Sequence, residues 1–149
     1  MKHTTALICG AVALLGLSAT GAAGQAVPRN YERGPVTMVQ QVEVMPGQLN
    51  AYMRMLANTW RVSMEEGKRA GAILSYNIEQ PIDARAGEPN LYLIVVYKDL
   101  QSIQRPYADA DRSTAAIYGS LDKAQAVGME RESLRKARGS MILQGLQFK

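Results

Sequence analysis

The stretch VEVMPGQLNAYMRMLANTW, residues 42–60, contains the end of a β-strand, a turn and most of an amphipathic helix. The strand extends back to residue 36, because residues 36–45 alternate between two sides and one side is mainly apolar. That alternation is typical of a strand with one buried face. Pro46 suits the first turn of the following helix, where its missing N–H is not needed. These residues therefore predict a strand that leads directly into a helix.

The helix is predicted from a broad apolar stripe. Its apolar residues recur at helical spacing: Leu49, Tyr52, Met53, Leu56, Trp60 and Met64. Gly67 and Gly71 follow, and either glycine can end a helix. We therefore expect one continuous helix that ends at one of these glycines.

Two further strands follow the helix. Residues 72–79 (AILSYNIE) have the composition of a strand, and residues 80–89 (QPIDARAGEP) are rich in turn formers. Residues 91–98 (LYLIVVYK) are apolar on both sides, which is typical of a central strand. The two segments therefore predict a second strand at the side of a sheet and a third strand near its middle.

The C-terminal third predicts helical structure and then a last strand. Asp99 can cap a short helical turn through residue 105, and residues 107–119 favour a helix. Ser120 is a candidate N-cap for a helix that runs to about Ala137. Residues 140–148 (SMILQGLQF) predict the final strand, in which Gly145 would form a bulge.

The predicted order is β-α-β-β-α-β, the ferredoxin-like α+β plan. Right-handed crossovers place the first and third strands in the middle of a four-stranded antiparallel sheet, with the helices on one face. The other face is predicted to carry Val39 and Ile73 beside Gln41, Ser75 and Asn77. Because that face is too apolar to lie fully in water, we expect a partner to cover it, most simply a second copy of the chain.

These residues resemble a known group of proteins. The strand-Pro-Gly-helix-Gly-strand pattern of residues 42–78, followed by NLYLIVVYKDLQSI, is similar to the dimeric α/β-barrel superfamily. The likeness covers residues 36–149. It implies a homodimer in which two sheets meet face to face as a barrel. Members include cofactor-free monooxygenases, haem-degrading and haem-dependent enzymes, isomerases and many proteins of unknown role, so the resemblance alone does not assign a chemistry.

The N-terminus has the three parts of a secretory signal peptide. A basic head with Lys2 precedes an apolar run of 14 residues, 6–19, and the small residues of 20–26 follow. The run is shorter than the ~20 residues that a membrane-spanning helix needs. We therefore expect a signal peptide over residues 1–26, cleaved between about residues 22 and 26, and a periplasmic or secreted protein without a stable membrane anchor. Residues 27–35 are predicted to be a flexible leader before the domain of residues 36–149.

Cleavage would remove His3 and Cys9, which are the only histidine and the only cysteine. A proximal haem histidine, a His-based triad and a His-rich zinc site are then excluded, and we expect no cofactor and no metal. The net charge of +4 is spread over interspersed acids and bases, which does not indicate nucleic-acid binding. In the densest basic stretch, RESLRKAR (131–138), Glu132 precedes Lys136 by four residues, which predicts an exposed helix.

Aromatic side chains are the remaining candidates for a ligand site: Tyr52, Trp60, Tyr76 and Tyr92. Trp60 lies in the apolar stripe, so core packing is its simplest role. The favoured function is non-enzymatic binding of a small apolar or aromatic ligand, or an accessory role in the envelope. The alternative is a cofactor-free monooxygenase or isomerase that acts in a helix–sheet pocket, and whether the chain is an enzyme stays open. A filled space around Trp60 would favour the first function, and a cavity with convergent polar groups would favour the second.

Overall fold

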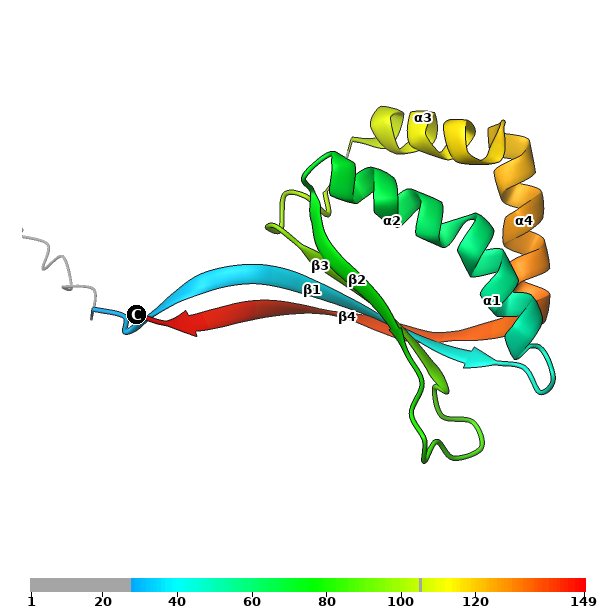
Figure 1. Ribbon diagram of the computed structural model, residues 1–149, viewed down its shortest axis with the longest axis horizontal. Coiled ribbons are helices and arrows are strands. Elements are labelled where there is room, and N and C mark those ends of the chain that lie inside the picture. Colours follow the sequence, from blue (N-terminus) through cyan, green and yellow to red (C-terminus); the bar gives the residue numbers. More distant parts are fainter. Residues whose placement is uncertain (1–27, 105) are drawn as a thin grey trace, which may run out of the picture.

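A computed structural model describes residues 28–104 and 106–149. Its elements, in chain order, are β1 (Tyr31–Val44), α1 (Leu49–Asn58), α2 (Trp60–Arg69), β2 (Ile73–Glu79), β3 (Leu91–Tyr97), α3 (Tyr107–Tyr118), α4 (Leu121–Leu134) and β4 (Arg135–Phe148). The four strands form one antiparallel sheet in the order β2-β3-β1-β4, and the helices lie on one side of it (Figure 1). The predicted ferredoxin-like α+β fold, with the first and third strands central, is confirmed. The predicted signal peptide lies outside the described residues.

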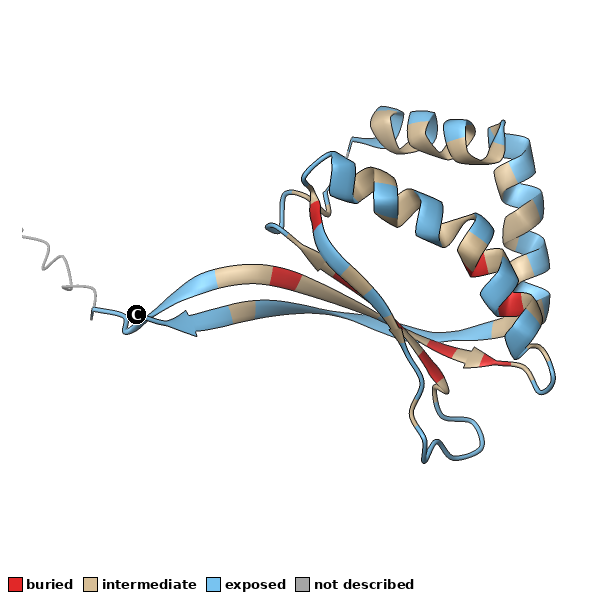
Figure 2. Ribbon diagram, in the orientation of Figure 1, coloured by how far each residue is buried: buried red, intermediate tan, exposed pale blue. Residues whose placement is uncertain are grey.

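The buried core lies between α1 and the adjoining ends of β1 and β3 (Figure 2). Val42 pairs with Leu91 across the two central strands, and both side chains face the helices. The core comprises Val42, Val44, Tyr52, Leu56, Leu91 and Leu93, with Trp60, Ile78 and Leu134 packed against it in part. The apolar stripe and the apolar third strand therefore meet each other, as their patterns predict.

The predicted single helix is interrupted at Thr59. The Thr59 hydroxyl donates to the Met55 carbonyl at 2.8 Å, and the Thr59 backbone N–H donates to the same oxygen at 3.0 Å. Thr59 has φ −124° and ψ −67°, which lie outside the helical range, so α1 ends and α2 begins there. A threonine hydroxyl bonded to the carbonyl four residues back is known to bend helices. Gly67 lies inside α2, and Gly71, with a φ of 71°, follows its end.

The strand β1 begins within the segment 27–35 that the sequence predicts to be a flexible leader, so that prediction is wrong from Tyr31 onward. Residues 31–33 pair with residues 146–148 of β4, and this two-stranded ribbon projects beyond the rest of the sheet (Figure 1). The register shifts where Gly34 and Pro35 lie opposite Gly145. The bulge is therefore in β1, and the prediction that Gly145 itself forms a bulge is wrong, because Gly145 is the single residue opposite it. A Cβ on Gly145 would come within 2.7 Å of the Pro35 carbonyl oxygen, so the close approach of the bulge requires a glycine there.

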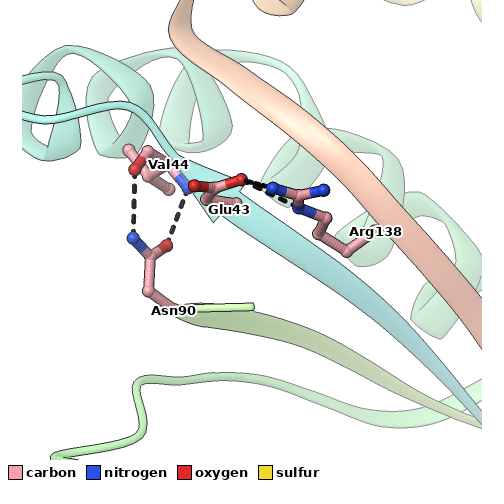
Figure 3. A network of polar contacts seen from close by, with 4 residues as sticks. All are labelled: Glu43, Val44, Asn90 and Arg138. Carbon is pink, nitrogen blue, oxygen red and sulfur yellow. Dashed lines mark hydrogen bonds and ion pairs between the residues drawn. The ribbon is translucent and has the colours of Figure 1, made fainter. Parts of the chain in front are cut away.

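The strand β4 begins at Arg135, earlier than the predicted residue 140, and α4 ends at Leu134 instead of near Ala137. Residues 135–137 pair with residues 42–44 of β1. If α4 continued to residue 137, the backbone N–H and C=O groups on this side of β1 would have no partner strand. On this part of the sheet, Arg138 forms an ion pair with Glu43 (Figure 3).

The side chain of Asn90 completes the pairing of β1 beyond the start of β3. Its carbonyl oxygen accepts from the Val44 N–H at 2.7 Å, and its amide donates to the Val44 carbonyl at 3.0 Å (Figure 3). One side chain therefore supplies both bonds that a paired strand residue would make.

The predicted N-cap of α4 is confirmed, because the Ser120 hydroxyl accepts from the Lys123 N–H at 3.1 Å. The segment 107–119 is helical as α3. After β3, the Asp99 carboxylate accepts from both the backbone N–H and the hydroxyl of Ser102, each at 2.8 Å. These bonds form a turn at the place where the sequence predicts a short helix.

Ile73 lies on the helix face of the sheet, which corrects the prediction that it lies on the open face. The register of β2 against β3 shifts between Ile73 and Ser75, so alternation from one end of β2 does not hold at the other. Ile73 is buried below Gly67 of α2. The open face carries Val39, as predicted, together with other apolar residues that the register places beside it: Ile94, Val96, Met141 and Leu143.

Candidate functional site

A cavity of about 240 Å³ lies between the helices and the sheet, beside the core, and we refer to it as the helix–sheet cavity. Side chains of β1 and β3 line it from the sheet, and side chains of α1, α2, α3 and the α4–β4 junction close it. The lining residues are Met38, Gln40, Tyr52, Met55, Leu56, Thr59, Trp60, Ser63, Met64, Leu93, Val95, Tyr97, Tyr118, Arg131 and Arg135. Most of this wall is apolar or aromatic.

The helix α4 contributes little to the wall of the cavity. Neither α3 nor α4 has a fully buried residue. The half-buried stripe of α4 is Ala124, Val127, Gly128, Arg131 and Leu134. Of this stripe only Arg131 lines the cavity, whereas Val127 and Leu134 line a separate groove against α1. The helix therefore supplies one charged residue and no large apolar side chain to the space.

Three polar side chains converge on one end of the cavity: Tyr52, Arg131 and Arg135. Tyr52 is only 1% exposed. Burial raises the pKa of its hydroxyl above the ordinary value of 10.0, and the positive charges of Arg135 and Arg131 oppose this effect only in part. The hydroxyl is therefore neutral at neutral pH and is available as a hydrogen-bond donor.

The two arginines share a single carboxylate. Arg135 Nη2 lies 2.9 Å from Glu132 Oε1, and Arg131 Nε lies 3.7 Å from the same oxygen. The Nε atoms of both arginines are buried, and neither has a hydrogen-bond partner among the described residues. Buried donors without partners are rare in folded proteins and call for an explanation.

The four predicted aromatic residues do not form one site. Tyr52 and Trp60 line the cavity. Tyr76 packs edge to face against Trp60, and its hydroxyl donates to the Glu65 carboxylate. Tyr92 pairs with Gln41 in the register of the open face, on the opposite side of the sheet. The structure thus brings Tyr52 and Trp60 together, places Tyr76 behind Trp60, and separates Tyr92 from them.

The sequence pattern did not point to the residues that add polarity to the cavity: Gln40, Tyr97, Tyr118, Arg131 and Arg135. The stretch 131–138 predicts an exposed helix, but Lys136 lies in β4, and the side chain of Arg135 is 14% exposed. The spacing of the two arginines, four residues apart, would place both on one face of the predicted helix, but Arg135 lies in β4.

Neither metal ligands nor a membrane-spanning helix are found in residues 28–104 and 106–149. Within these residues, no three His, Cys, Asp or Glu side chains lie close enough to hold a metal ion. No helix in the same part of the chain is long and apolar enough to cross a bilayer.

No protein-family model matches the chain, and no curated protein matches it either. Solved structures do resemble it. A protein from Shewanella oneidensis is 12% identical, with 78% of this chain and 98% of that chain covered and a TM-score of 0.50. A dimeric ferredoxin-like protein from an uncultured marine organism is 10% identical, with coverage of 79% and 90% and a TM-score of 0.48. A Chloroflexus aurantiacus protein, provisionally described as an antibiotic biosynthesis monooxygenase, is 18% identical, with coverage of 74% and 92% and a TM-score of 0.43.

The likeness to the Shewanella oneidensis protein concerns the fold alone, and it agrees with the four-stranded sheet described above. Identities this low carry no information about chemistry, because one fold supports many functions. The function must therefore be argued from the cavity itself.

Proposed function

We propose that this chain is a small-molecule-binding domain that holds an apolar or aromatic ligand in the helix–sheet cavity. The observation that carries the proposal is the cavity of about 240 Å³ with an apolar and aromatic wall. An apolar cavity of about 150 Å³ is enough to hold a benzene ring. Side chains around an unfilled space lose dispersion contacts, which a ligand of complementary shape would restore.

The polar residues of the wall favour binding over the alternative of a cofactor-free monooxygenase or isomerase. A space around Trp60 would suit either function, but such an enzyme needs a group that removes a proton from its substrate. The described lining residues include no histidine, cysteine or carboxylate. Tyr52 has a raised pKa and so keeps its proton at neutral pH. The convergent groups are therefore hydrogen-bond donors, which position a ligand and do not deprotonate it.

A homodimer joined through the open sheet face is part of the proposal. Val39, Ile94 and Val96 lie on this face, and Met141 beside them is 41% exposed. In the described part of the chain every helix packs on the other face (Figure 1). Burying apolar area is worth ~25 cal/mol per Å², so a second copy of the same apolar surface would stabilise both chains.

We also propose that the chain is exported and acts in the periplasm or outside the cell. Lys2, the apolar run 6–19 and the small residues 20–26 support this location. N-terminal sequencing of the exported protein is expected to begin between Ala23 and Pro28. An intact Met1 on soluble cytoplasmic protein would contradict export.

Methionine methyl groups give a direct test of ligand binding. Met38, Met55 and Met64 line the cavity, whereas Met129 is 72% exposed on α4 and Met141 lies on the open face. The chain would be labelled with ¹³C-methyl methionine and titrated with 3-phenylpropionamide, a neutral aromatic probe. We expect saturable shifts of the first three methyl signals, with the last two unchanged.

A cavity-filling variant provides the control. Ser63 lines the cavity, and Ser63→Leu would occupy part of its volume. The variant is expected to keep the circular dichroism spectrum of the wild type and to lose the saturable shifts. Shifts that are linear in probe concentration, or equal at the five methionines named above, would contradict the proposal.

A further inference from the structure

The two arginines of the cavity are held at a single place. Arg131 lies in the last turn of α4, and Arg135 is the first residue of β4. Both line the cavity beside Tyr52, whose pKa responds to the charge of each. The exposed fraction of the side chain is 41% for Arg131 and 14% for Arg135, so Arg135 is the deeper of the two.

The charges at this place do not balance. Arg131 and Arg135 are the only charged residues among those that line the cavity. Glu132 is the only carboxylate within ion-pair distance of either in the described residues, and it is itself 54% exposed. Two positive charges and one negative charge leave one positive charge in excess next to an apolar space.

The two arginines also have N–H donors without acceptors among the described residues. Arg135 uses Nη2 for Glu132, and its buried Nε is left without a partner. The buried Nε of Arg131 is likewise without a hydrogen bond. A carboxylate typically accepts two parallel N–H bonds from one guanidinium, including the Nε–H. An anionic group at this end of the cavity would therefore satisfy donors that the folded chain leaves open.

We propose that the ligand of the helix–sheet cavity is a small aromatic or aliphatic carboxylate. This inference rests on the proposed binding function and adds the ligand's chemical class. Arg131 and Arg135 hold the carboxylate, with the neutral Tyr52 hydroxyl as a third donor. The apolar body of the ligand lies toward Trp60 and Leu93. One excess positive charge matches a monoanion better than a dianion.

The test compares two probes of nearly equal shape, 3-phenylpropionate and 3-phenylpropionamide, which differ in charge. Dissociation constants would be measured by methionine methyl titration at low and at high salt. We expect the wild type to bind the carboxylate about tenfold or more tightly than the amide, with the preference reduced at high salt.

Four variants separate anion recognition from general stability. Arg131→Gln and Arg135→Gln should each bring the ratio of the two dissociation constants, amide over carboxylate, closer to one. The dissociation constant of the amide should change little. Arg112→Gln is the matched control, because Arg112 lies on α3, its side chain is 79% exposed and it pairs with Asp109. Glu132→Gln removes the competing carboxylate and should tighten binding of 3-phenylpropionate alone. A purely structural role of the arginines does not predict this gain.

The outcomes are distinguishable. Equal binding of both probes by the wild type would overturn the carboxylate assignment and leave the proposed binding function intact. Failure of both probes to bind would overturn the assignment and the proposed function together. If Arg135→Gln does not fold, Arg131→Gln and Glu132→Gln still decide, and an unchanged preference in both would contradict the proposal.

Discussion

Trp60 and Tyr76 meet edge to face, with ring centroids 5.3 Å apart and ring planes at 87°. The contact joins the start of α2 to β2. Tyr76 is tied to α2 a second time, because its hydroxyl donates to Glu65 and the Lys68 ammonium lies 5.7 Å from its ring centroid. The indole of Trp60 is therefore supported on one side by Tyr76 and faces the cavity on the other.

Replacing Trp60 by alanine should cost about 2–3 kcal/mol in the free energy of unfolding. This is less than the about 3–5 kcal/mol typical of a fully buried tryptophan, because one side of the ring already faces an open space. Urea unfolding followed by circular dichroism would give the value. Trp60→Phe should cost less than about 1.5 kcal/mol, because it keeps most of the apolar contact with Tyr76. A loss of more than 4 kcal/mol (about the core value) in Trp60→Ala would show that the ring is enclosed.

Tyr52 should make the protein less stable at high pH. Its pKa is raised above 10.0 in the folded chain. The folded state therefore holds the proton more tightly than the unfolded state, so this stability is present below the unfolded pKa and is lost as the pH rises through the folded one. Melting temperatures from about pH 9 to about pH 11 should fall more steeply for the wild type than for Tyr52→Phe. Parallel curves would contradict the raised pKa.

Gly67 should resist replacement by alanine, although it lies inside a helix. Alanine is favoured over glycine by about 1 kcal/mol in a helix interior. Here, however, a Cβ would lie 2.4 Å from Ile73 Cδ1. We expect Gly67→Ala to destabilise the chain by about 1 kcal/mol or more, through overpacking.

The clash can be relieved without restoring the glycine. A Cβ at position 67 would also lie 2.9 Å from Ile73 Cγ1 but 3.5 Å from Ile73 Cβ. Ile73→Ala removes both Cδ1 and Cγ1, so Gly67→Ala should become neutral or stabilising in that background. Thermal melts of the two single variants and the double variant would measure the coupling. A stabilising Gly67→Ala in the wild-type background would show that α2 and β2 lie further apart.

Much of the sheet could be predicted because its signals are local. A strand's pattern indicates how many of its faces are buried. One buried face is indicated by the alternation of residues 36–45 and two by the apolar run of residues 91–98, and β1 and β3 form at these places. Register shifts carry no such signal. One shift moved Ile73 to the helix face, and another brought residues 135–137 into β4, because backbone pairing with β1 outweighs helix propensity there.

The candidate site was harder to predict, because an apolar stripe does not show whether the space beside it is filled. Trp60 and Tyr52 belong to an apolar stripe that is identical for a filled core and for a cavity wall. Only the structure shows that the space between this stripe and the α4–β4 junction is left open. The role of Arg135 depends on the exact end of α4, and the ends of elements are the least predictable feature of a sequence.

A charge on the open face should separate the proposed dimer. Val39 lies on a central strand of this face, where it pairs with Ile94 and Met141. Val39→Lys should give a monomer, because burying an unpaired ammonium costs more than the apolar contact gains. Light scattering at micromolar concentration would report the mass. Ile82→Lys is the matched control, because Ile82 is fully exposed in the β2–β3 connection and should leave the dimer unchanged. A monomeric wild type would contradict the face-to-face dimer.

A crystal structure with 4-iodobenzoate would test the helix–sheet cavity most directly, because the anomalous signal of iodine places the ligand without assumptions about its contacts. We predict a single strong iodine peak inside the cavity, among Met38, Trp60 and Leu93, with the carboxylate at Arg131 and Arg135. A cavity closed by the side chains of α4, or iodine found only on the outer surface, would contradict the account.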